Sequence, residues 1–270
     1  MLDSKHIGFI GGGAMAEALI SGLIKCSHIQ PGQITVNDIN SSRLKYLQTT
    51  FGINISTDGQ EVATKADLLF LTVKPQVMNE VLDVVAPVIS KSTVVVSVAA
   101  GITIASLQGK MPGVPIVRVM PNTPVAVSEG MSAIALGKYA SKKVEEIITF
   151  IFSSVGKAVT VDENSMDAVT GLSGSGPAYA FLLIDALTDA GVRVGFSRRT
   201  AVLLAAQTLL GAAKMVLETG EHPAKLRDMV TSPGGTAITG IHMLEQRSVR
   251  AAMIDAVVAA TNRSREMGQK

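Results

Sequence analysis

Cysteine is almost missing from this sequence. The one cysteine among 270 residues, Cys26, cannot form a disulfide within the chain, which suits a reducing, cytoplasmic location. We expect Cys26 to be a packed thiol in the first helix. The N-terminal residues also lack the basic segment, apolar segment and cleavage site of a signal peptide, so none is predicted.

Long runs of charged or apolar residues are absent as well. The net charge is +2, with no basic run and no alternation of basic and aromatic residues, so we expect no nucleic-acid partner. The two most apolar late runs, 178–187 and 201–213, are too short to cross a bilayer, so we expect no membrane partner. We predict no metal site. The 47% apolar content can instead form the core of one large or two modest domains.

A glycine-rich turn near the N-terminus is the strongest positive signal. The short apolar strand 7–10 leads into Gly11-x-Gly13-x-x-Ala16, and a helix of small and aliphatic residues follows over 14–24. In a dinucleotide-binding turn, the first glycine permits a tight turn, the second lets a pyrophosphate approach the backbone, and the third small residue packs the helix on the strand. The same spacing occurs in turns that bind nothing, but its place at the start of an α/β pattern favours a dinucleotide site.

Asp38 ends a second predicted strand, 34–38. It follows the glycine turn by about twenty residues, where such folds place the side chain that meets the adenosine ribose. A carboxylate there accepts hydrogen bonds from a 2′-hydroxyl and repels a 2′-phosphate, which favours NADH. Arg43 weakens this preference, and Asp38 could alternatively cap the helix expected near Ser41.

Three further buried strands end in unusual residues. Since ligands of open α/β sheets bind beyond the carboxyl ends of the strands, these ends outline a coenzyme cleft, with small residues that leave space for a flat ring. Lys74 could alternatively be a surface lysine, and Asn122 could simply shape a turn. The strands are 67–73, 93–98 and 116–119, followed by Lys74-Pro75-Gln76, Ala99-Ala100-Gly101 and Met120-Pro121-Asn122-Thr123-Pro124. Edge strands are expected at 131–136 and 155–161, around a helix over 141–152.

The strand signal stops near residue 160. We therefore predict a doubly wound Rossmann-type α/β domain over 1–160 and an all-α domain over 161–270, with helix starts at Ser197 and His222-Pro223. The segments 178–184 and 202–206 are apolar around most of the helix, so we expect dimer helices to cover them. Packing within one subunit is the alternative.

Two glycine–serine segments interrupt the helical half. The segment 173–177 precedes a long helix, and 231–236 precedes the next-to-last one. Both are expected to place hydroxyls and free backbone N–H groups at a helix N-terminus, where a carboxylate binds favourably. Ordinary helix capping is the alternative interpretation of each.

Taken in order, these motifs closely resemble the pyrroline-5-carboxylate reductase family over essentially the whole chain. The resemblance implies an N-terminal Rossmann domain and a helical dimerisation domain, hence a homodimer or a larger ring such as a decamer. It also implies reduction of 1-pyrroline-5-carboxylate to L-proline by NADPH or NADH. The motifs are Gly8-Phe9-Ile10-Gly11-Gly12-Gly13, Val73-Lys74-Pro75-Gln76, Ala99-Ala100-Gly101, Met120-Pro121-Asn122-Thr123-Pro124, Gly171-Leu172-Ser173-Gly174-Ser175-Gly176-Pro177-Ala178-Tyr179 and Ser232-Pro233-Gly234-Gly235.

The resemblance also implies roles for particular residues. Ser232 and the backbone of Gly234 and Gly235 would hold the substrate carboxylate, Ser175 and Gly176 would line the same pocket, and Glu163 would face the ring nitrogen. Together with the glycine turn, the implied coenzyme residues are Ile10, Gly11, Gly12, Gly13, Ala14, Met15, Asn37, Asp38, Thr72, Val73, Lys74, Pro75, Ala99, Ala100 and Asn122.

One departure from the family concerns the substrate nitrogen. The family usually has threonine where this chain has Ala237, and here the threonine comes one place earlier, at Thr236. Either Thr236, our candidate catalytic residue, or a water takes over the contact, or turnover is weakened. Asp38 is a second departure, because members that prefer NADPH tend to carry a residue there that tolerates phosphate.

The histidines and lysines of the chain bear on other possible functions. None of the four histidines lies in a recognisable catalytic arrangement, which suits a readily protonated cyclic imine better than a keto or hydroxy acid. A hydroxy-acid enzyme would want a lysine on the first long helix of the helical domain, and 167–190 contains none. The alternatives are a reductase of another cyclic imino acid and a non-catalytic, coenzyme-binding regulatory protein.

Overall fold

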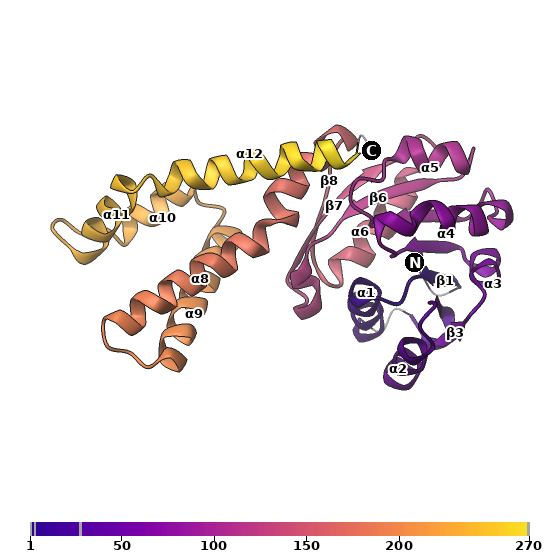
Figure 1. The fold of residues 1–270 in the computed structure, drawn as a ribbon, viewed down its shortest axis with the longest axis horizontal. Coiled ribbons are helices and arrows are strands. Elements are labelled where there is room, and N and C mark those ends of the chain that lie inside the picture. Colours follow the sequence, from indigo (N-terminus) through magenta and orange to yellow (C-terminus); the bar gives the residue numbers. More distant parts are fainter. Residues whose placement is uncertain (1, 3, 27–28, 269–270) are drawn as a thin grey trace. The chain divides into compact units, whose positions relative to one another are not determined.

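The computed structural model describes residues 2, 4–26 and 29–268 and divides the chain into two compact units (Figure 1). The first comprises Met1–Ser175 together with Ala259–Lys270, and the second comprises Gly176–Val258. The last strand of the chain ends at Thr160, the residue near which the sequence analysis predicted a domain boundary.

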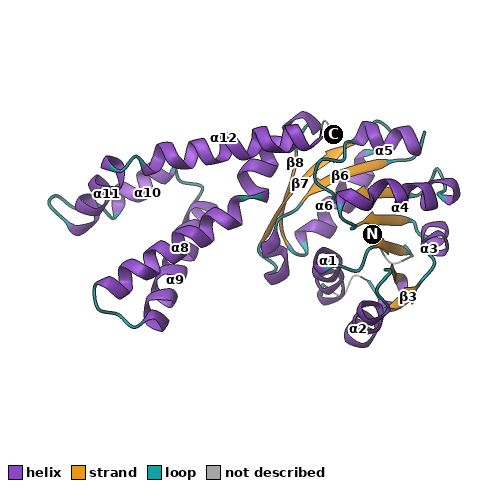
Figure 2. Cartoon of the chain, viewed as in Figure 1, coloured by secondary structure: helices purple, strands orange, loops and turns teal. Residues whose placement is uncertain are grey.

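A single eight-stranded sheet forms the centre of the first unit (Figure 2). Its first six strands are parallel and follow the order of a dinucleotide-binding fold, with the direction of winding reversed between β1 and β4. β7 runs antiparallel to β6, and β8 is an edge strand parallel to β7. In sheet order the strands are β3 (Asn54–Ser56), β2 (Ile34–Asn37), β1 (Ile7–Ile10), β4 (Leu68–Leu71), β5 (Val94–Ser97), β6 (Ile116–Met120), β7 (Gly130–Leu136) and β8 (Gly156–Thr160).

Helices cover both faces of this sheet. One face packs against α1, α2 and α6, and the other against α3, α4, α5 and α7. They span α1 (Ala14–Lys25), α2 (Ser41–Phe51), α3 (Gly59–Lys65), α4 (Met78–Val85), α5 (Ile104–Lys110), α6 (Lys142–Ser153) and α7 (Met166–Val169). The predicted doubly wound α/β fold is confirmed, and β3, α3 and α5 are elements that the sequence analysis did not identify.

The strands read as continuous apolar runs because side chains alternate between two buried faces. Phe9 and Phe70 stack on the face of α1, α2 and α6, with ring centroids 4.9 Å apart. Their neighbours Leu69 and Leu71 point to the opposite face. Burial of both faces fixes the register of β1 against β4, and this register places the ends of the two strands beside each other.

The second unit is helical, as predicted. The end of α8 lies so close to the start of α9 that a Cβ added to Gly191 would come within 2.8 Å of the Ala201 Cβ. Ser197 and His222 cap α9 and α10 through their side chains, which confirms both predicted helix starts. The helices are α8 (Gly176–Arg193), α9 (Arg198–Thr219), α10 (Pro223–Met229), α11 (Thr236–Gln246) and α12 (Val249–Gly268), whose last residues belong to the first unit.

Three local expectations are wrong. Cys26 is exposed rather than packed, because α1 ends at Lys25 and Cys26 follows as its C-cap. The predicted break at 171–177 is a π-helical turn, Thr170–Gly174, followed by α8, which already contains Gly176 and Pro177. The apolar run 201–213 belongs to the longer α9, which by length and composition alone could cross a membrane; 11% of its apolar window is buried.

Candidate active site

Gly11 makes the tight turn that follows β1. Its φ of +100° belongs to the region that favours glycine, and its N–H donates to Asn37 O at 2.8 Å. A Cβ at this position would lie 2.9 Å from Val73 Cγ1 and 3.0 Å from the Thr72 carbonyl. The close approach of the backbone after β4 therefore requires the glycine that the motif supplies.

Gly13 is the N-cap of α1 and leaves the helix N-terminus open. It has no side chain with which to accept from the first N–H groups of the helix, which have no partner within a helix. A Cβ built on Gly13 meets no atom within 4 Å. Backbone donors facing an open space are the features that a pyrophosphate needs, so the residues present fit a dinucleotide.

Thr72 braces the turn from the end of β4. Its Oγ1 donates to Gly11 O at 2.7 Å and lies 3.1 Å from Ile10 O, while its N–H donates to Ile10 O at 2.9 Å. The Thr72 hydroxyl proton is therefore directed at the turn. Thr72 thus holds the backbone of the glycine turn in place through its hydrogen bonds.

Asp38 also bonds to the glycine turn. Its Oδ2 accepts from Gly12 N–H at 2.7 Å, and its Oδ1 accepts from Asn40 N–H at 2.8 Å. Asn40 is the N-cap of α2, accepting from Arg43 N–H at 3.1 Å, so Asp38 does not cap that helix. The carboxylate keeps further acceptor capacity beside the turn, as recognition of a ribose hydroxyl requires.

The residues that follow the next strands differ in burial and in the hydrogen bonds that they make within the chain. Lys74 is exposed, and its side chain makes no hydrogen bond or ion pair within the described part of the chain, while Pro75 begins a 3₁₀ turn. Ala99 is buried and Ala100 half-buried. Asn122 accepts from Met131 N–H at 2.8 Å and donates to Ser173 O at 3.0 Å, so its amide joins β7 to the π-helical turn.

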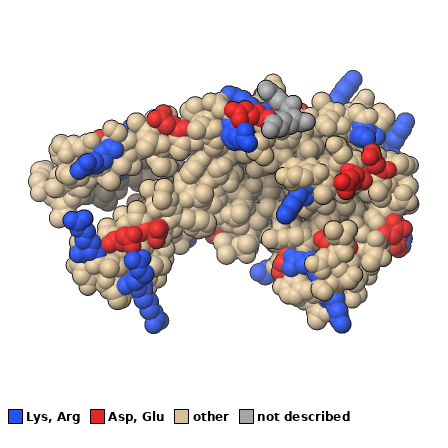
Figure 3. Space-filling view, viewed as in Figure 1, with Lys and Arg blue, Asp and Glu red and all other residues tan. Residues whose placement is uncertain are grey.

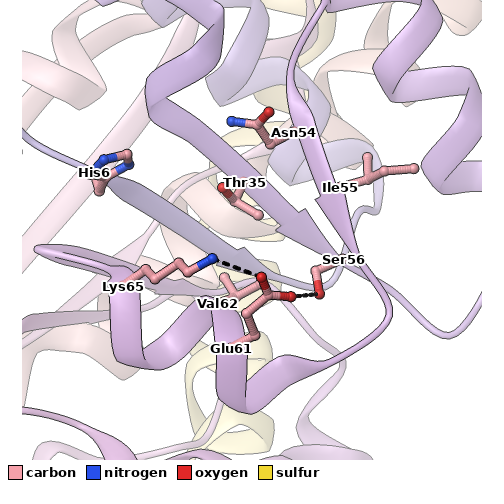
Figure 4. Close-up of a pocket in the computed structure, with 8 residues that line it drawn as sticks. All are labelled: His6, Thr35, Asn54, Ile55, Ser56, Glu61, Val62 and Lys65. Carbon is pink, nitrogen blue, oxygen red and sulfur yellow. Dashed lines mark hydrogen bonds and ion pairs between the residues drawn. The ribbon is translucent and has the colours of Figure 1, made fainter.

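A separate pocket of about 360 Å³ lies between α3 and the strands β2 and β3 (Figure 4). Its polar lining includes His6 and the Glu61 carboxylate, which bonds to Ser56 and Lys65. None of the predicted site residues lines this pocket. It is therefore distinct from the glycine turn.

Glu163 belongs to the first unit and is largely engaged there. Its Oε1 accepts from Ile104 N–H at 2.6 Å, at the start of α5, and lies 3.3 Å from Nη1 of Arg118. Arg118 is 6% exposed, so its charge is buried and Glu163 is its counter-ion. Arg118 was not predicted as a site residue, although a lone arginine inside the apolar run 116–120 could have indicated a buried partner.

Ser175 and Gly176 stand at the junction between the π-helical turn and α8. Ser175 N–H donates to Thr170 O at 2.8 Å, the long reach of a π-helical bond. One of the backbone N–H groups that we expected to be free at this segment, that of Ser175, is therefore bonded within the π-helical turn.

The loop before α11 has no side chain that caps the N-terminus of this helix. Gly234 has a φ of +65°, and Gly235 N–H donates to Ser232 O at 3.0 Å. Gly235 is the N-cap of α11 and offers no side-chain cap, so neither serine nor proline caps this helix. The side chain of Thr236 is exposed at the first helical position, and Ala237 follows.

The fold and the glycine turn define a class: an NAD(P)-dependent oxidoreductase with a Rossmann domain. A family model described as NADP oxidoreductase coenzyme F420-dependent matches residues 6–101, and one described as pyrroline-5-carboxylate reductase dimerisation matches residues 163–267. The chain is 47% identical to a pyrroline-5-carboxylate reductase of Methanosarcina acetivorans over 100% of both chains. It therefore belongs to the pyrroline-5-carboxylate reductase family.

Two solved structures agree with this assignment. A pyrroline-5-carboxylate reductase from Coxiella burnetii is 36% identical, with a TM-score of 0.91 and 98% of each chain covered. The enzyme of Plasmodium falciparum, solved with NADP bound, is 31% identical, with a TM-score of 0.88 and 98% of each chain covered. NADP is thus bound by a relative that has the same fold.

Proposed function

We propose that this chain reduces the C=N bond of 1-pyrroline-5-carboxylate to give L-proline. The observation that carries the proposal is the open, braced glycine turn of a Rossmann fold in a chain 47% identical, over its whole length, to a pyrroline-5-carboxylate reductase. When bound, NAD(P)H supplies the hydride. A cyclic imine protonates readily, so the protein has mainly to hold the ring in position.

We assign the substrate carboxylate to the loop before α11. Gly235 leaves the N-terminal N–H groups of this 11-residue helix uncapped, and Ser232 adds a hydroxyl donor. Thr236 is exposed and makes no side-chain hydrogen bond within the described residues. Its hydroxyl can therefore donate a hydrogen bond to the ring nitrogen of the substrate or accept one from it. Ser175 and Gly176 are proposed as further substrate-binding residues.

Glu163 would act through its second carboxylate oxygen. Because Oε1 is held by Ile104 N–H and Arg118, the orientation of the carboxylate is fixed, and Oε2 has no hydrogen bond within the described residues. We propose that Oε2 faces the protonated ring nitrogen. Asp38 is proposed to favour NADH, since its carboxylate repels a 2′-phosphate.

The helical unit is proposed to form a homodimer. Phe181, Leu182 and Leu203 are 63–68% exposed in the single chain, and uncharged surface dominates the visible face of these helices (Figure 3). A second copy of the chain would cover them, and the same cover accounts for the apolar character of α9 without a membrane. A decamer of five such dimers and a cytoplasmic location complete the proposal.

The test follows the oxidation of NADH and, in parallel, of NADPH by the purified protein with 1-pyrroline-5-carboxylate. Proline formed in proportion to the coenzyme oxidised is the expected result. Tight coenzyme binding without turnover would contradict the proposal and favour a regulatory protein. Faster turnover of another cyclic imino acid would move the assignment to that substrate.

A matched pair of variants tests the substrate assignment. S232A should raise the substrate KM about tenfold, the contribution of one hydrogen bond to a charged group. S92A removes an exposed hydroxyl that precedes β5, whereas the proposed site residues Ala99 and Ala100 follow this strand, and it should leave KM unchanged. Equal KM values for S232A and the unmodified protein would remove Ser232 from the site.

A further inference from the structure

Three side chains form a bonded cluster against the glycine turn. Glu17 lies in the first turn of α1, and Arg43 and Tyr46 lie on one face of α2. The Arg43 side chain forms an ion pair with Glu17, and Tyr46 Oη donates to Glu17 Oε1 at 2.9 Å. We refer to Glu17, Arg43 and Tyr46 as the turn cluster.

Arg43 is held from several directions. Its Nε donates to Gly12 O at 2.5 Å, its Nη2 lies 3.3 Å from Gly13 O, and its guanidinium carbon lies 5.1 Å from the centre of the Tyr46 ring. Gly12 is also the residue whose N–H donates to Asp38. The carboxylate of Asp38 therefore binds the N–H of Gly12 and the guanidinium of Arg43 binds its carbonyl oxygen, at the place where the coenzyme ribose is expected.

Glu17 balances the charge of Arg43. Burial raises the pKa of the Glu17 carboxyl, and the hydrogen bonds from Arg43 and Tyr46 outweigh it, so that the pKa lies below its ordinary value. The carboxyl is thus ionised at neutral pH. Since guanidinium groups are the usual protein partners of a 2′-phosphate, the pairing decides whether this arginine is available to NADPH.

We propose that Glu17 is a specificity-determining residue for the coenzyme, because it holds and neutralises Arg43 and thereby withholds this guanidinium from the 2′-phosphate of NADPH. The inference rests on the coenzyme site of the proposed function. Glu17 is a positioning residue in this scheme, since it acts through Arg43. Its effect adds to the repulsion that Asp38 exerts on the same phosphate.

Removal of the Glu17 charge should release Arg43. In E17Q the guanidinium keeps its bonds to the carbonyl oxygens of Gly12 and Gly13 and its contact with the Tyr46 ring, but its charge is no longer balanced by the Glu17 carboxylate. It can then turn toward a phosphate ester. The relevant probe is the 2′-phosphate alone, compared on fragments that carry no nicotinamide.

The experiment is calorimetric titration with adenosine 2′,5′-bisphosphate and with adenosine 5′-monophosphate. The ratio of their affinities should rise about tenfold in E17Q, the contribution of one hydrogen bond to a charged group. The double variant E17Q/R43A should show no rise, because the released cation is gone. Y46F keeps the ion pair and should keep the ratio of the unmodified protein.

The single variant R43A gives an independent arm that needs no change at Glu17. It should leave the ratio unaltered, since the proposal holds Arg43 away from the phosphate in the unmodified protein. A fall in the ratio would mean that Arg43 already binds phosphate and would overturn the inference. An unchanged ratio in E17Q, or a rise that persists in E17Q/R43A, would overturn it as well.

A purely structural role for the cluster predicts a different pattern. Glu17 would then only brace the turn, and E17Q would weaken both fragments by the same factor; this result also overturns the inference. If the unmodified protein binds neither fragment, the coenzyme site itself fails, which separates failure of the proposed function from failure of the role of Glu17.

Discussion

Gly11 and Gly13 lie in the same turn, yet the structure predicts opposite consequences for G11A and G13A. At Gly13, φ is −67°, and an added Cβ meets no atom within 4 Å, so an alanine introduces no strain. At Gly11, φ is +100°, and the Cβ would lie 2.9 Å from Val73 Cγ1. G13A should therefore impair coenzyme binding alone, whereas G11A should destabilise the fold.

The magnitudes follow from the local geometry. An alanine in the left-handed region costs about 1–2 kcal/mol, and insertion of a methyl group into a packed site adds about 1–3 kcal/mol, so G11A should lose about 2–5 kcal/mol of unfolding free energy. In G13A the reduced freedom of the unfolded chain contributes about 0.4–1 kcal/mol. The poorer N-cap offsets this gain by several tenths of a kcal/mol, so the net change should be near zero.

Two measurements separate these effects. Urea unfolding without coenzyme should give the G13A variant the midpoint of the unmodified protein and the G11A variant a lower one. Titration with NADH should then show at least a tenfold loss of affinity in G13A, because the new Cβ occupies the space through which the pyrophosphate approaches the backbone. Unimpaired NADH binding by G13A would refute the assignment of the turn, and a large loss of stability in G13A would refute the geometry.

Four further changes test other parts of the molecule. D38S should lower the NADPH KM relative to the NADH KM in steady-state assays, and an unchanged ratio would remove Asp38 from the adenosine site. T236A should lower kcat more than A237T alters it if Thr236 contacts the ring nitrogen, and equal rates for T236A and the unmodified protein would exclude that contact. The pKa of Glu17 is lowered on folding, so its contribution to stability is complete above the ordinary value of 4.5 and is lost as pH falls through the folded-state pKa. The unfolding free energy of E17Q should therefore depend less on pH in that range, and the same pH dependence as in the unmodified protein would contradict this. L203E, at a side chain 68% exposed in the single chain, should give monomers in sedimentation, whereas persistence of dimers would place the interface elsewhere.

The sequence predicted the turn well because its spacing reflects local backbone requirements. The strand at Ile7–Ile10, the positive φ at Gly11 and the helix from Ala14 each depend on neighbours along the chain. The predicted break at 171–177 is wrong because a less common helical form accommodates these residues. Glycine, serine and proline ordinarily interrupt a helix, but the Ser175 N–H reaches Thr170 O and keeps this segment helical.

The contacts around the glycine turn could not be predicted from composition or spacing. Arg43 meets Glu17 across 26 residues only because parallel pairing of β1 with β2 sets α1 and α2 side by side on one face of the sheet. From the sequence alone, Arg43 merely weakened the preference that Asp38 indicated. In the structure the two side chains bind the N–H and the carbonyl oxygen of the same residue, Gly12, and a third residue, Glu17, forms an ion pair with the arginine. Coenzyme preference in this chain is therefore a property of a bonded network, which argues that replacement of Asp38 alone should give a smaller change than D38S combined with E17Q.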